Sequence, residues 1–217
     1  MNKTYRQECF LYICFMNREQ KSSQTQKLII NTSFDLFYKN GYAITTIPDI
    51  MKVTCLSKGA FYHHFKNKQD IGERVISNII KKRIYDGMIS PLKDYKQQKT
   101  TALLTDIFTS RLIEFSEIEK QLGCPANNLI NEVGQTEKGY RILLREIINL
   151  WKDSIIEVLN YGKSTNQIKE DTNAEAVATF LIVSFEGVRG IRKVYDTNEI
   201  LEAYTSAIQT YISNLKK

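Results

Sequence analysis

The residues whose types and spacing could carry chemistry lie in the stretch TTIPDIMKVTCLSKGAFYHHFKNKQD, from Thr45 to Asp70. It combines several lysines, a tyrosine, two adjacent histidines and a glycine near the start of a short helical segment. Lysine and tyrosine side chains can bind phosphate oxygens, and glycine lets another backbone approach closely. These groups favour noncovalent binding of a polyanion over bond-breaking chemistry.

Caps in the same stretch predict the elements that position these groups. Thr46 is a helix cap with Asp49 three residues later, which predicts a short helix over residues 47–53. After a tight turn, Ser57 is a cap for a second short helix over residues 58–64. Two short helices joined in this way indicate a helix-turn-helix, whose second helix enters the major groove of DNA.

The sequence GYAITTIPDIMKVTCLSKGAFYHHFKNKQDI closely resembles the DNA-binding domain of the TetR family of transcriptional regulators. The matching positions are Gly41, Tyr42, Thr45, Ile50, Ser57, Lys58, Gly59, Phe61, Tyr62, His64, Phe65, Lys68 and Ile71. The family usually has a small residue at the place of Met51 and often Ala-Gly at the place of Thr54 and Cys55. A cysteine in a left-handed turn would strain the backbone.

The second helix of the motif is expected to carry the contacts to the bases. Lys58, Ala60 and His63 are the candidates for groove contact, and Gly59 permits close backbone approach. The family resemblance implies that Tyr62 gives its hydroxyl to a phosphate.

Residues beside that helix are expected to bind phosphates or to support the fold. Lys68 begins the next helix, where its charge and the helix N-terminus both favour phosphate. Thr45 or Thr46 either adds a phosphate contact or serves in capping alone, and His64 either binds phosphate or lies at a domain interface. Two aromatic residues are expected in the core of the small domain: Phe61 and Phe65.

The net charge of +6 is unevenly distributed along the 217 residues. Residues 1–90 hold 14 Lys and Arg against seven Asp and Glu, whereas residues 91–217 hold 16 against 17. A basic first part joined to a nearly neutral body suggests a polyanionic partner for the first part.

Few glycines and prolines and long amphipathic segments predict an all-α protein of about nine helices. Three parts are expected: a flexible N-terminal arm over residues 1–24, a helix-turn-helix DNA-binding domain over 25–71, and an effector-binding and dimerisation domain over 72–217. The expected helices cover residues 25–40, 47–53, 58–64, 67–89, 101–119, 126–133, 136–159, 173–194 and 198–215.

In the second domain, the resemblance implies a dimer and an effector pocket. The pocket would be apolar and aromatic. Each residue taken singly is expected in the core, and only the set marks where a ligand could bind: Phe108, Leu112, Phe115, Cys124, Leu129, Trp151, Ile155 and Phe180. The last two helices would form a four-helix bundle between subunits or close the monomer core, through Phe180, Leu181, Val183, Val188, Ile200, Leu201, Tyr204, Ile208, Tyr211 and Ile212.

The four cysteines lack metal-ligand spacing, which is typical of reduced thiols. Cys124 follows Gly123 at the entry to a short helix, and a helix N-terminus lowers a thiol pKa. It is therefore either an electrophile or oxidant sensor or an inert buried thiol. The segment Gly123 to Leu129 resembles an AcrR- and NemR-like branch of the family.

Taken with the resemblance, these features favour a cytoplasmic DNA-binding regulator, which we expect to be a homodimeric repressor released from a palindromic operator by a small molecule. The alternative is a thiol-based sensor regulator acting through Cys124. No catalytic set, cofactor or metal site is expected, and no apolar run is long enough to span a membrane. Another alternative is a membrane-surface or helical scaffold protein that uses the basic N-terminal part. Operator binding would distinguish the regulator from it, because affinity for an operator depends on the DNA sequence and falls steeply with salt.

Overall fold

A computed structural model describes residues 18–217, which divide into two compact units on either side of the Val75–Ile76 bond. Most of the predicted N-terminal arm, with Cys9 and Cys14, lies outside the described residues. The prediction of a flexible arm is wrong for residues 18–24, which form the first turns of a helix. This polar segment contains neither Gly nor Pro, so nothing in it breaks a helix.

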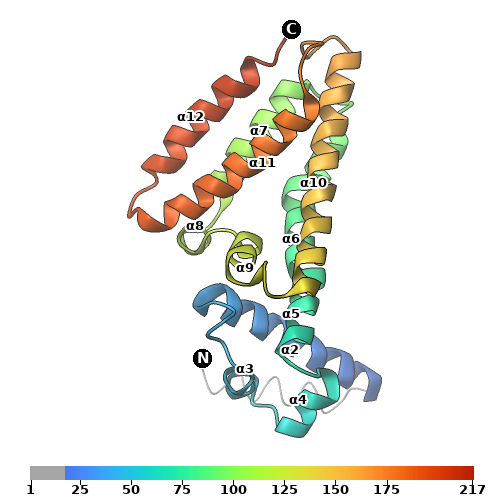
Figure 1. The fold of residues 1–217 in the computed structure, drawn as a ribbon, viewed down its shortest axis with the longest axis vertical. Helices are drawn as coiled ribbons and strands as arrows, with labels where there is room; N and C mark the ends of the chain where they lie inside the picture. Colours follow the sequence, from blue (N-terminus) through green and yellow to red (C-terminus); the bar gives the residue numbers. More distant parts are fainter. Residues whose placement is uncertain (1–17) are drawn as a thin grey trace. The chain divides into compact units, whose positions relative to one another are not determined.

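Within residues 18–75, the first unit contains the helices α2 (Arg18–Asn40), α3 (Ile47–Thr54), α4 (Lys58–His64) and α5 (Lys68–Val75) (Figure 1). Gly41 follows α2 with a φ of 95°, a conformation that suits glycine at a helix end. The helices bury a common apolar core: Ile29, Phe37, Ile50, Phe61, Phe65, Ile71 and Val75. Through this core, α3 and α5 pack against the longer α2.

The second unit is helical throughout (Figure 1). Its elements are η1 (Ile76–Ile80), α6 (Lys81–Ile84), η2 (Tyr85–Ile89), η3 (Ser90–Asp94), α7 (Thr100–Glu114), α8 (Glu117–Leu122), α9 (Pro125–Val133), α10 (Lys138–Ser164), α11 (Ala174–Ile191), η4 (Arg192–Val194) and α12 (Glu199–Ser213). Across residues 18–217 the only β-type pairing is an isolated antiparallel bridge between Ile168 and Lys216. The predicted all-α class is confirmed.

None of the helices in the described part of the chain is both long enough and apolar enough to cross a membrane.

Two of the predicted helices, those over residues 67–89 and 101–119, are divided in the structure. The segment before Pro91 contains two π-helical stretches, η1 and η2, which flank α6. The helix predicted over residues 101–119 is two helices, because Ser116 starts α8 with a capping box. The Ser116 backbone N–H donates to Glu119 Oε2 at 3.1 Å, and the Glu119 N–H donates to Ser116 Oγ at 3.3 Å.

An aromatic cluster fills the core of the second unit. The Phe108 and Trp151 rings lie nearly parallel with centroids 6.1 Å apart. Phe185 packs edge-on against both rings, at 5.6 and 6.0 Å. All three side chains are fully buried. Such packing stabilises this unit and leaves little space among the rings.

Candidate nucleic-acid interface

Helix α3 starts with the predicted cap. The Asp49 backbone N–H donates to Thr46 Oγ1 at 3.3 Å, and the Thr46 N–H donates to Asp49 Oδ2 at 2.8 Å. The Thr46 hydroxyl donates to the same carboxylate oxygen at 2.5 Å. These hydrogen bonds lower the pKa of Asp49, so its carboxylate stays ionised and holds the first turn.

The turn between α3 and α4 contains a strained residue. Cys55 has φ 57° and ψ 26°, in the left-handed region, where the Cβ of a non-glycine residue is crowded. The Thr54 hydroxyl donates to the Ile50 carbonyl at 2.9 Å and helps to end α3. The strain expected for a cysteine at this turn is therefore present.

The variant Cys55→Gly is expected to be more stable than the natural chain by up to about 1 kcal/mol. Glycine removes the left-handed strain, and its extra freedom in the unfolded chain offsets part of that gain. Urea denaturation followed by helical circular dichroism measures the difference. Cys55→Ala is the control, since alanine keeps the Cβ; equal stability of the two variants would contradict the explanation by strain.

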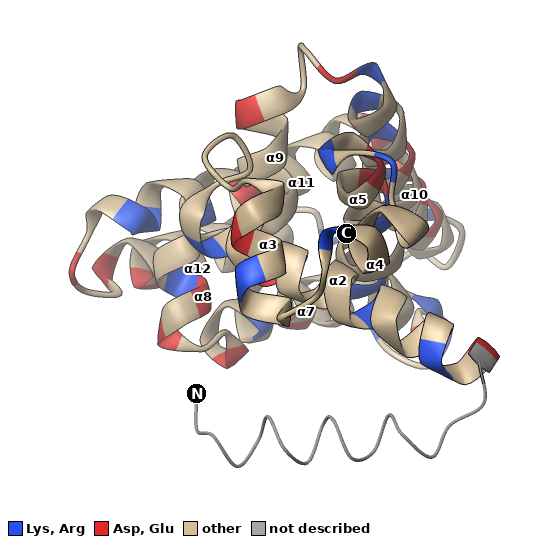
Figure 2. Cartoon of the chain, turned by 90° about the horizontal axis from the view of Figure 1, so that it is seen from below, with Lys and Arg blue, Asp and Glu red and all other residues tan. Residues whose placement is uncertain are grey.

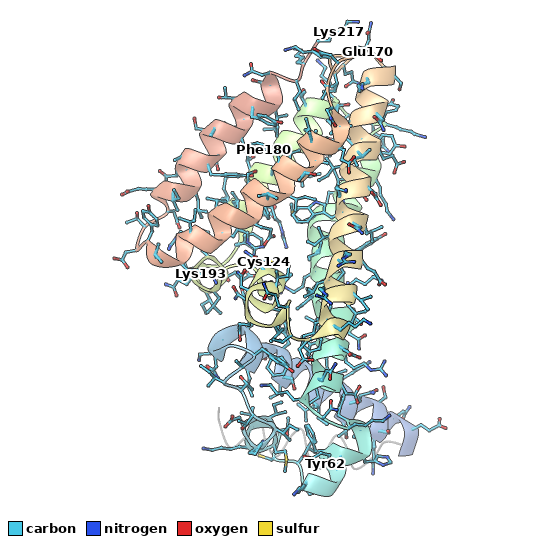
Figure 3. The ribbon with its side chains drawn as sticks, in the orientation of Figure 1. Tyr62, Cys124, Glu170, Phe180, Lys193 and Lys217 are labelled. Atoms are coloured by element: carbon cyan, nitrogen blue, oxygen red, sulfur yellow. The ribbon has the colours of Figure 1, made fainter. Side chains whose placement is uncertain are left out.

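Helix α4 turns an aromatic side inward and a polar side outward. The Ala60 N–H donates to Ser57 Oγ at 3.2 Å, which confirms Ser57 as the cap. Phe61 and Phe65 are buried, as predicted for core residues. Tyr62, 47% exposed, lies on α4 on the outside of the first unit (Figure 3).

The outer surface of α4 allows another molecule to come close. Lys58, Gly59 and His63 are exposed, and Ala60 is half-buried. A Cβ atom placed on Gly59 would meet no protein atom within 4 Å. The Gly59 backbone therefore borders open space, as a helix that approaches the floor of a DNA groove requires.

Of the flanking residues, Thr45 and Lys68 make contacts within the unit. Thr45 is only 3% exposed, and its hydroxyl donates to the Gly41 carbonyl at 2.8 Å. This burial gives the Thr45 side chain a role in the fold and leaves it without access to a phosphate. Lys68 Nζ donates to the Ala43 carbonyl at 3.2 Å and lies 4.1 Å from the Tyr42 ring centroid.

The two histidines at the end of α4 differ in environment. His63 is exposed and His64 is half-buried, with ring centroids 5.0 Å apart. Burial lowers the pKa of His64, and the charge of His63 adds to that effect. Both line a groove of about 590 Å³ whose other wall is the N-terminal part of α2, residues 19–26. We therefore expect neutral His64 to act as a hydrogen-bonding group rather than a cation.

The sequence interpretation missed two exposed lysines near α4. Lys52 lies in the last turn of α3, and Lys66 lies in the link to α5. The Lys66 N–H donates to Asp70 Oδ2 at 3.1 Å, which fixes the backbone of that link. Figure 2 shows basic segments on both α2 and α3. The lysine types and positions were visible in the sequence, but their exposure was not.

The predicted effector residues only partly surround a cavity in the second unit. Three of them, Phe115, Cys124 and Trp151, line a space of about 30 Å³. The other buried ones pack away from it: Phe108, Leu112, Leu129 and Ile155. Phe180 is 44% exposed, and its ring packs at a tilt of 43° against the Tyr211 ring, with centroids 4.4 Å apart. The sequence interpretation missed the charged residues of the lining: Arg83, Arg111, Glu186 and Arg189.

Cys124 is buried, and the predicted lowering of its pKa is wrong. Burial raises the pKa of the thiol to about 12, and the neighbouring Glu186 adds to the rise. The charge of Arg189 and the hydrogen bond from the Asn127 backbone N–H lower the pKa of the thiol, but by less than burial raises it. The rise in thiol pKa from desolvation thus exceeds any lowering by the N-terminus of α9, and the thiol is protonated at neutral pH.

Three of the residues predicted for a subunit interface are half-buried, namely Ile200, Tyr204 and Tyr211, and the others divide into two sets. The first set is buried within the monomer: Leu181, Val188, Leu201, Ile208 and Ile212. Phe180, labelled in Figure 3, and Val183 are by contrast 44% and 63% exposed on α11. The core alternative therefore holds for the buried residues, and an interface between subunits stays a prediction for the exposed ones.

No group of three or more His, Cys, Asp and Glu side chains in residues 18–217 is placed to hold a metal ion.

Comparisons with known proteins agree with this arrangement. The family described as "Bacterial regulatory proteins, tetR family" matches residues 29–75, and "Tetracyclin repressor-like, C-terminal domain" matches residues 105–208. A transcriptional regulator encoded in the lacX 3′ region of Lactococcus lactis is 25% identical over 86% of this chain and 92% of its own. The transcriptional repressor DhaR of a Mycobacterium species is 21% identical over 83% of this chain and 88% of its own.

A solved structure shares the fold. The crystal structure of a TetR transcriptional regulator from Chloroflexus aurantiacus superposes with a TM-score of 0.79, at 24% identity, over 91% of this chain and 98% of that one. The matching families and relatives are transcriptional regulators, not enzymes. From its helix-turn-helix to its helical second unit, the chain belongs to the TetR family of DNA-binding transcriptional regulators.

Proposed function

We propose that this regulator is a homodimeric repressor that binds a nearly palindromic operator through α4 and is released by a small molecule. The single observation that carries the DNA-binding role is the outward face of α4, where Gly59 borders open space between exposed Lys58 and Tyr62. The name of the relative DhaR, a repressor, supports repression.

In this proposal α4 lies in the major groove. Lys58, Ala60 and His63 face base edges, and Tyr62 donates its hydroxyl to a phosphate. The exposed Thr46, Lys52 and Lys66 add phosphate contacts from both sides of the motif. Lys68 completes the set if its hydrogen bond to the Ala43 carbonyl is exchanged for one to a phosphate.

The recognition helix α4 is short, so we expect operator binding to require a second copy of it. The seven residues of α4 offer few side chains to the bases, so one copy gives limited affinity and specificity. A two-fold dimer places two copies of α4 on two half-sites. Exposed Phe180 and Val183 support α11 as part of the dimer surface, and α12 contributes Tyr211 beside Phe180.

The test compares two duplexes of equal length, one from the region upstream of the protein's own gene and one of random sequence. The upstream duplex is expected to bind more tightly by roughly a thousandfold or more, with affinity falling steeply as salt rises. Fluorescence anisotropy at several salt concentrations measures both effects. Equal affinity for the two duplexes would refute operator recognition.

The alternative, a thiol sensor acting through Cys124, lacks support from the geometry, because the thiol is buried and protonated. At neutral pH, Cys124 is expected to react with N-ethylmaleimide about a hundredfold more slowly than exposed Cys55. Mass spectrometry of the time course measures both rates. In a Cys55→Ser background, release of DNA by the reagent that disappears in Cys124→Ser would restore the sensor hypothesis.

A further inference from the structure

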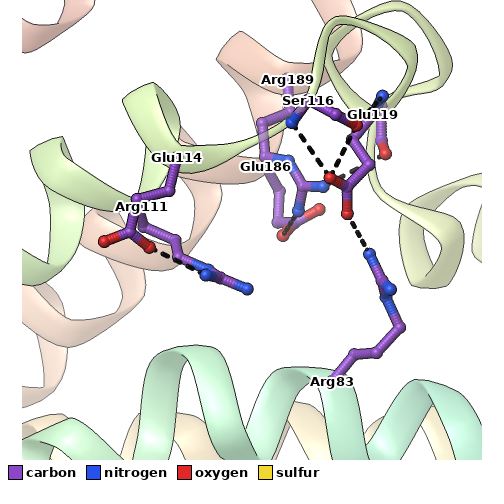
Figure 4. A network of polar contacts seen from close by, with 8 residues as sticks. Arg83, Arg111, Glu114, Ser116, Glu119, Glu186 and Arg189 are labelled. Atoms are coloured by element: carbon purple, nitrogen blue, oxygen red, sulfur yellow. Dashed lines mark hydrogen bonds and ion pairs between the residues drawn. The ribbon is translucent and has the colours of Figure 1, made fainter.

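Three arginines of the second unit have their charge partners within the protein. Their ion pairs with carboxylates are drawn in Figure 4: Arg83–Glu119, Arg111–Glu114 and Arg189–Glu186. The space of about 30 Å³ that these arginines border has the volume of about one water molecule. A larger polar groove lies in the first unit.

This groove, of about 590 Å³, lies between the N-terminal part of α2 and the end of α4. Its α4 wall consists of His63 and His64, and its α2 wall is entirely polar: Glu19, Lys21, Ser22, Ser23, Thr25 and Gln26. Hydroxyl, amide, ammonium and imidazole groups therefore border one space, and each of these groups can donate a hydrogen bond. The single carboxylate of the lining is that of Glu19.

The N-terminal part of α2 is helical although it contributes nothing to the core. None of residues 19–28 is buried, and burial along α2 begins at Ile29. The family match of the first unit also begins at residue 29. Since packing of an apolar face stabilises most helices in proteins, core packing does not account for residues 19–28. Their side chains are available to a partner outside the first unit.

The groove side of α2 continues the side that packs in the core. Ile30, Ser33 and Phe37 are buried, and Ser22 and Gln26 precede them at the same spacing of three or four residues. One face of the helix is thus buried along its second half and polar along its first half. A partner that suits hydroxyl and amide groups offers hydrogen-bond acceptors, as the phosphate oxygens of DNA do.

The groove is continuous with the surface expected to bind DNA. His63 belongs to both, because it is exposed on α4 and also lines the groove. Residues 18–28 contain three basic residues and one acidic residue, and basic Lys21 lies in the groove lining. The stretch from residue 19 to residue 26 is roughly 10 Å long, which is enough to follow about two or three phosphates of one strand.

We propose that the N-terminal part of α2 is a second DNA-binding element, which holds the sugar–phosphate backbone of one operator strand in this groove beside α4. Ser22, Ser23 and Gln26 donate hydrogen bonds to phosphate oxygens, and Lys21 contributes positive charge. These contacts fix the orientation of α4 in the major groove without reading bases. The inference rests on the proposed function, because it adds a contact to the DNA that α4 binds.

The first test removes the charge of Lys21. Because phosphate contacts are independent of sequence, each variant is titrated with both the upstream duplex and the random duplex at several salt concentrations. Lys21→Met is expected to bind each duplex roughly three- to tenfold more weakly at about 0.1 M salt, and its logarithmic salt slope is expected to be smaller by about one. Lys96→Met is the matched control, since Lys96 is an exposed lysine of the second unit. It is expected to keep the natural slope.

The second test places a carboxylate on either side of the same helix. Ser23 lines the groove, whereas its exposed neighbour Gln24 does not. Ser23→Glu is expected to weaken binding of both duplexes roughly tenfold or more, because the new charge faces phosphates, and to weaken it more than Gln24→Glu does. Glu19→Gln removes the carboxylate of the groove and is expected to tighten binding roughly twofold or more, a gain that a folding defect cannot produce. Circular dichroism confirms that each variant is folded.

The inference and the proposed function fail by different results. If Lys21→Met keeps the salt slope of Lys96→Met and Ser23→Glu binds DNA as Gln24→Glu does, the groove serves another partner and the inference is overturned, even where the operator is bound specifically. If the natural chain binds both duplexes equally, operator recognition is refuted. The random duplex then still tests the α2 contact, because phosphate binding requires no particular sequence.

Discussion

Replacing Gly59 with glutamate is expected to abolish operator binding while the protein remains folded. A side chain at this position would enter open space, so it meets no steric barrier within the protein. Glutamate also has a higher helix propensity than glycine, by up to about 1 kcal/mol. On the DNA, however, the same side chain would separate α4 from the groove and bring a negative charge towards the phosphates. We expect operator affinity to fall roughly a hundredfold or more, since like-charge contacts cost several kcal/mol.

Two controls separate these effects. Asn149→Glu makes the same change of charge at an exposed position of α10, in the second unit, and is expected to leave operator affinity nearly unchanged. Gly59→Gln introduces a similar volume without the charge and isolates the steric part. Circular dichroism confirms that each variant is folded, and anisotropy gives its affinity. Tight operator binding by Gly59→Glu would show that α4 does not lie in the groove as proposed.

The helix-turn-helix could be predicted from the sequence because its determinants are local. Thr46 with Asp49 and Ser57 with Ala60 are cap contacts between residues three apart, and these pairs are visible in the sequence. The apolar positions Phe61 and Phe65 follow from the same short spacing. The strain at Cys55 could also be predicted locally, because the turn of this motif favours a left-handed residue and a cysteine has a Cβ atom that is crowded there.

Contacts between distant residues were not visible in the same way. The hydrogen bond from Lys68 to Ala43 joins residues 25 apart, and the burial of Thr45 depends on its packing near α2. The prediction for Cys124 used the local effect of a helix N-terminus, but burial by other helices determines its pKa. Periodicity identified Trp151 as a buried aromatic, yet it gave no indication that the indole nitrogen lacks an acceptor.

The cavity also depends on distant parts of the chain. Arg83, Arg111 and Arg189 are each unremarkable as isolated basic residues, and only the folded second unit brings them around one space. Phe108 and Trp151, two of the aromatic residues expected to form a pocket, instead pack against each other and against Phe185. Aromatic composition alone therefore could not distinguish a filled core from a binding site.

Replacing Val183 with glutamate is expected to convert the proposed dimer into monomers and thereby to remove operator binding. Val183 is 63% exposed on α11, on the same side as Phe180, three residues before it. In a monomer its replacement disturbs little packing, so the fold should persist. In an apolar subunit interface, two symmetry-related carboxylates would be dehydrated without partners, at a cost of several kcal/mol. We expect the dimer dissociation constant to rise roughly a hundredfold or more.

Sedimentation velocity over a range of concentrations measures the dissociation constant, and anisotropy measures operator affinity on the same samples. Ile142→Glu is the matched control, since Ile142 is an exposed apolar residue on α10 rather than on α11. Because a monomer presents one short α4 instead of two, operator affinity in Val183→Glu should fall together with dimerisation, and higher protein concentration should restore both. A variant that stays dimeric would place the subunit interface elsewhere, whereas a monomer that binds the operator at full affinity would show that α4 needs no second copy.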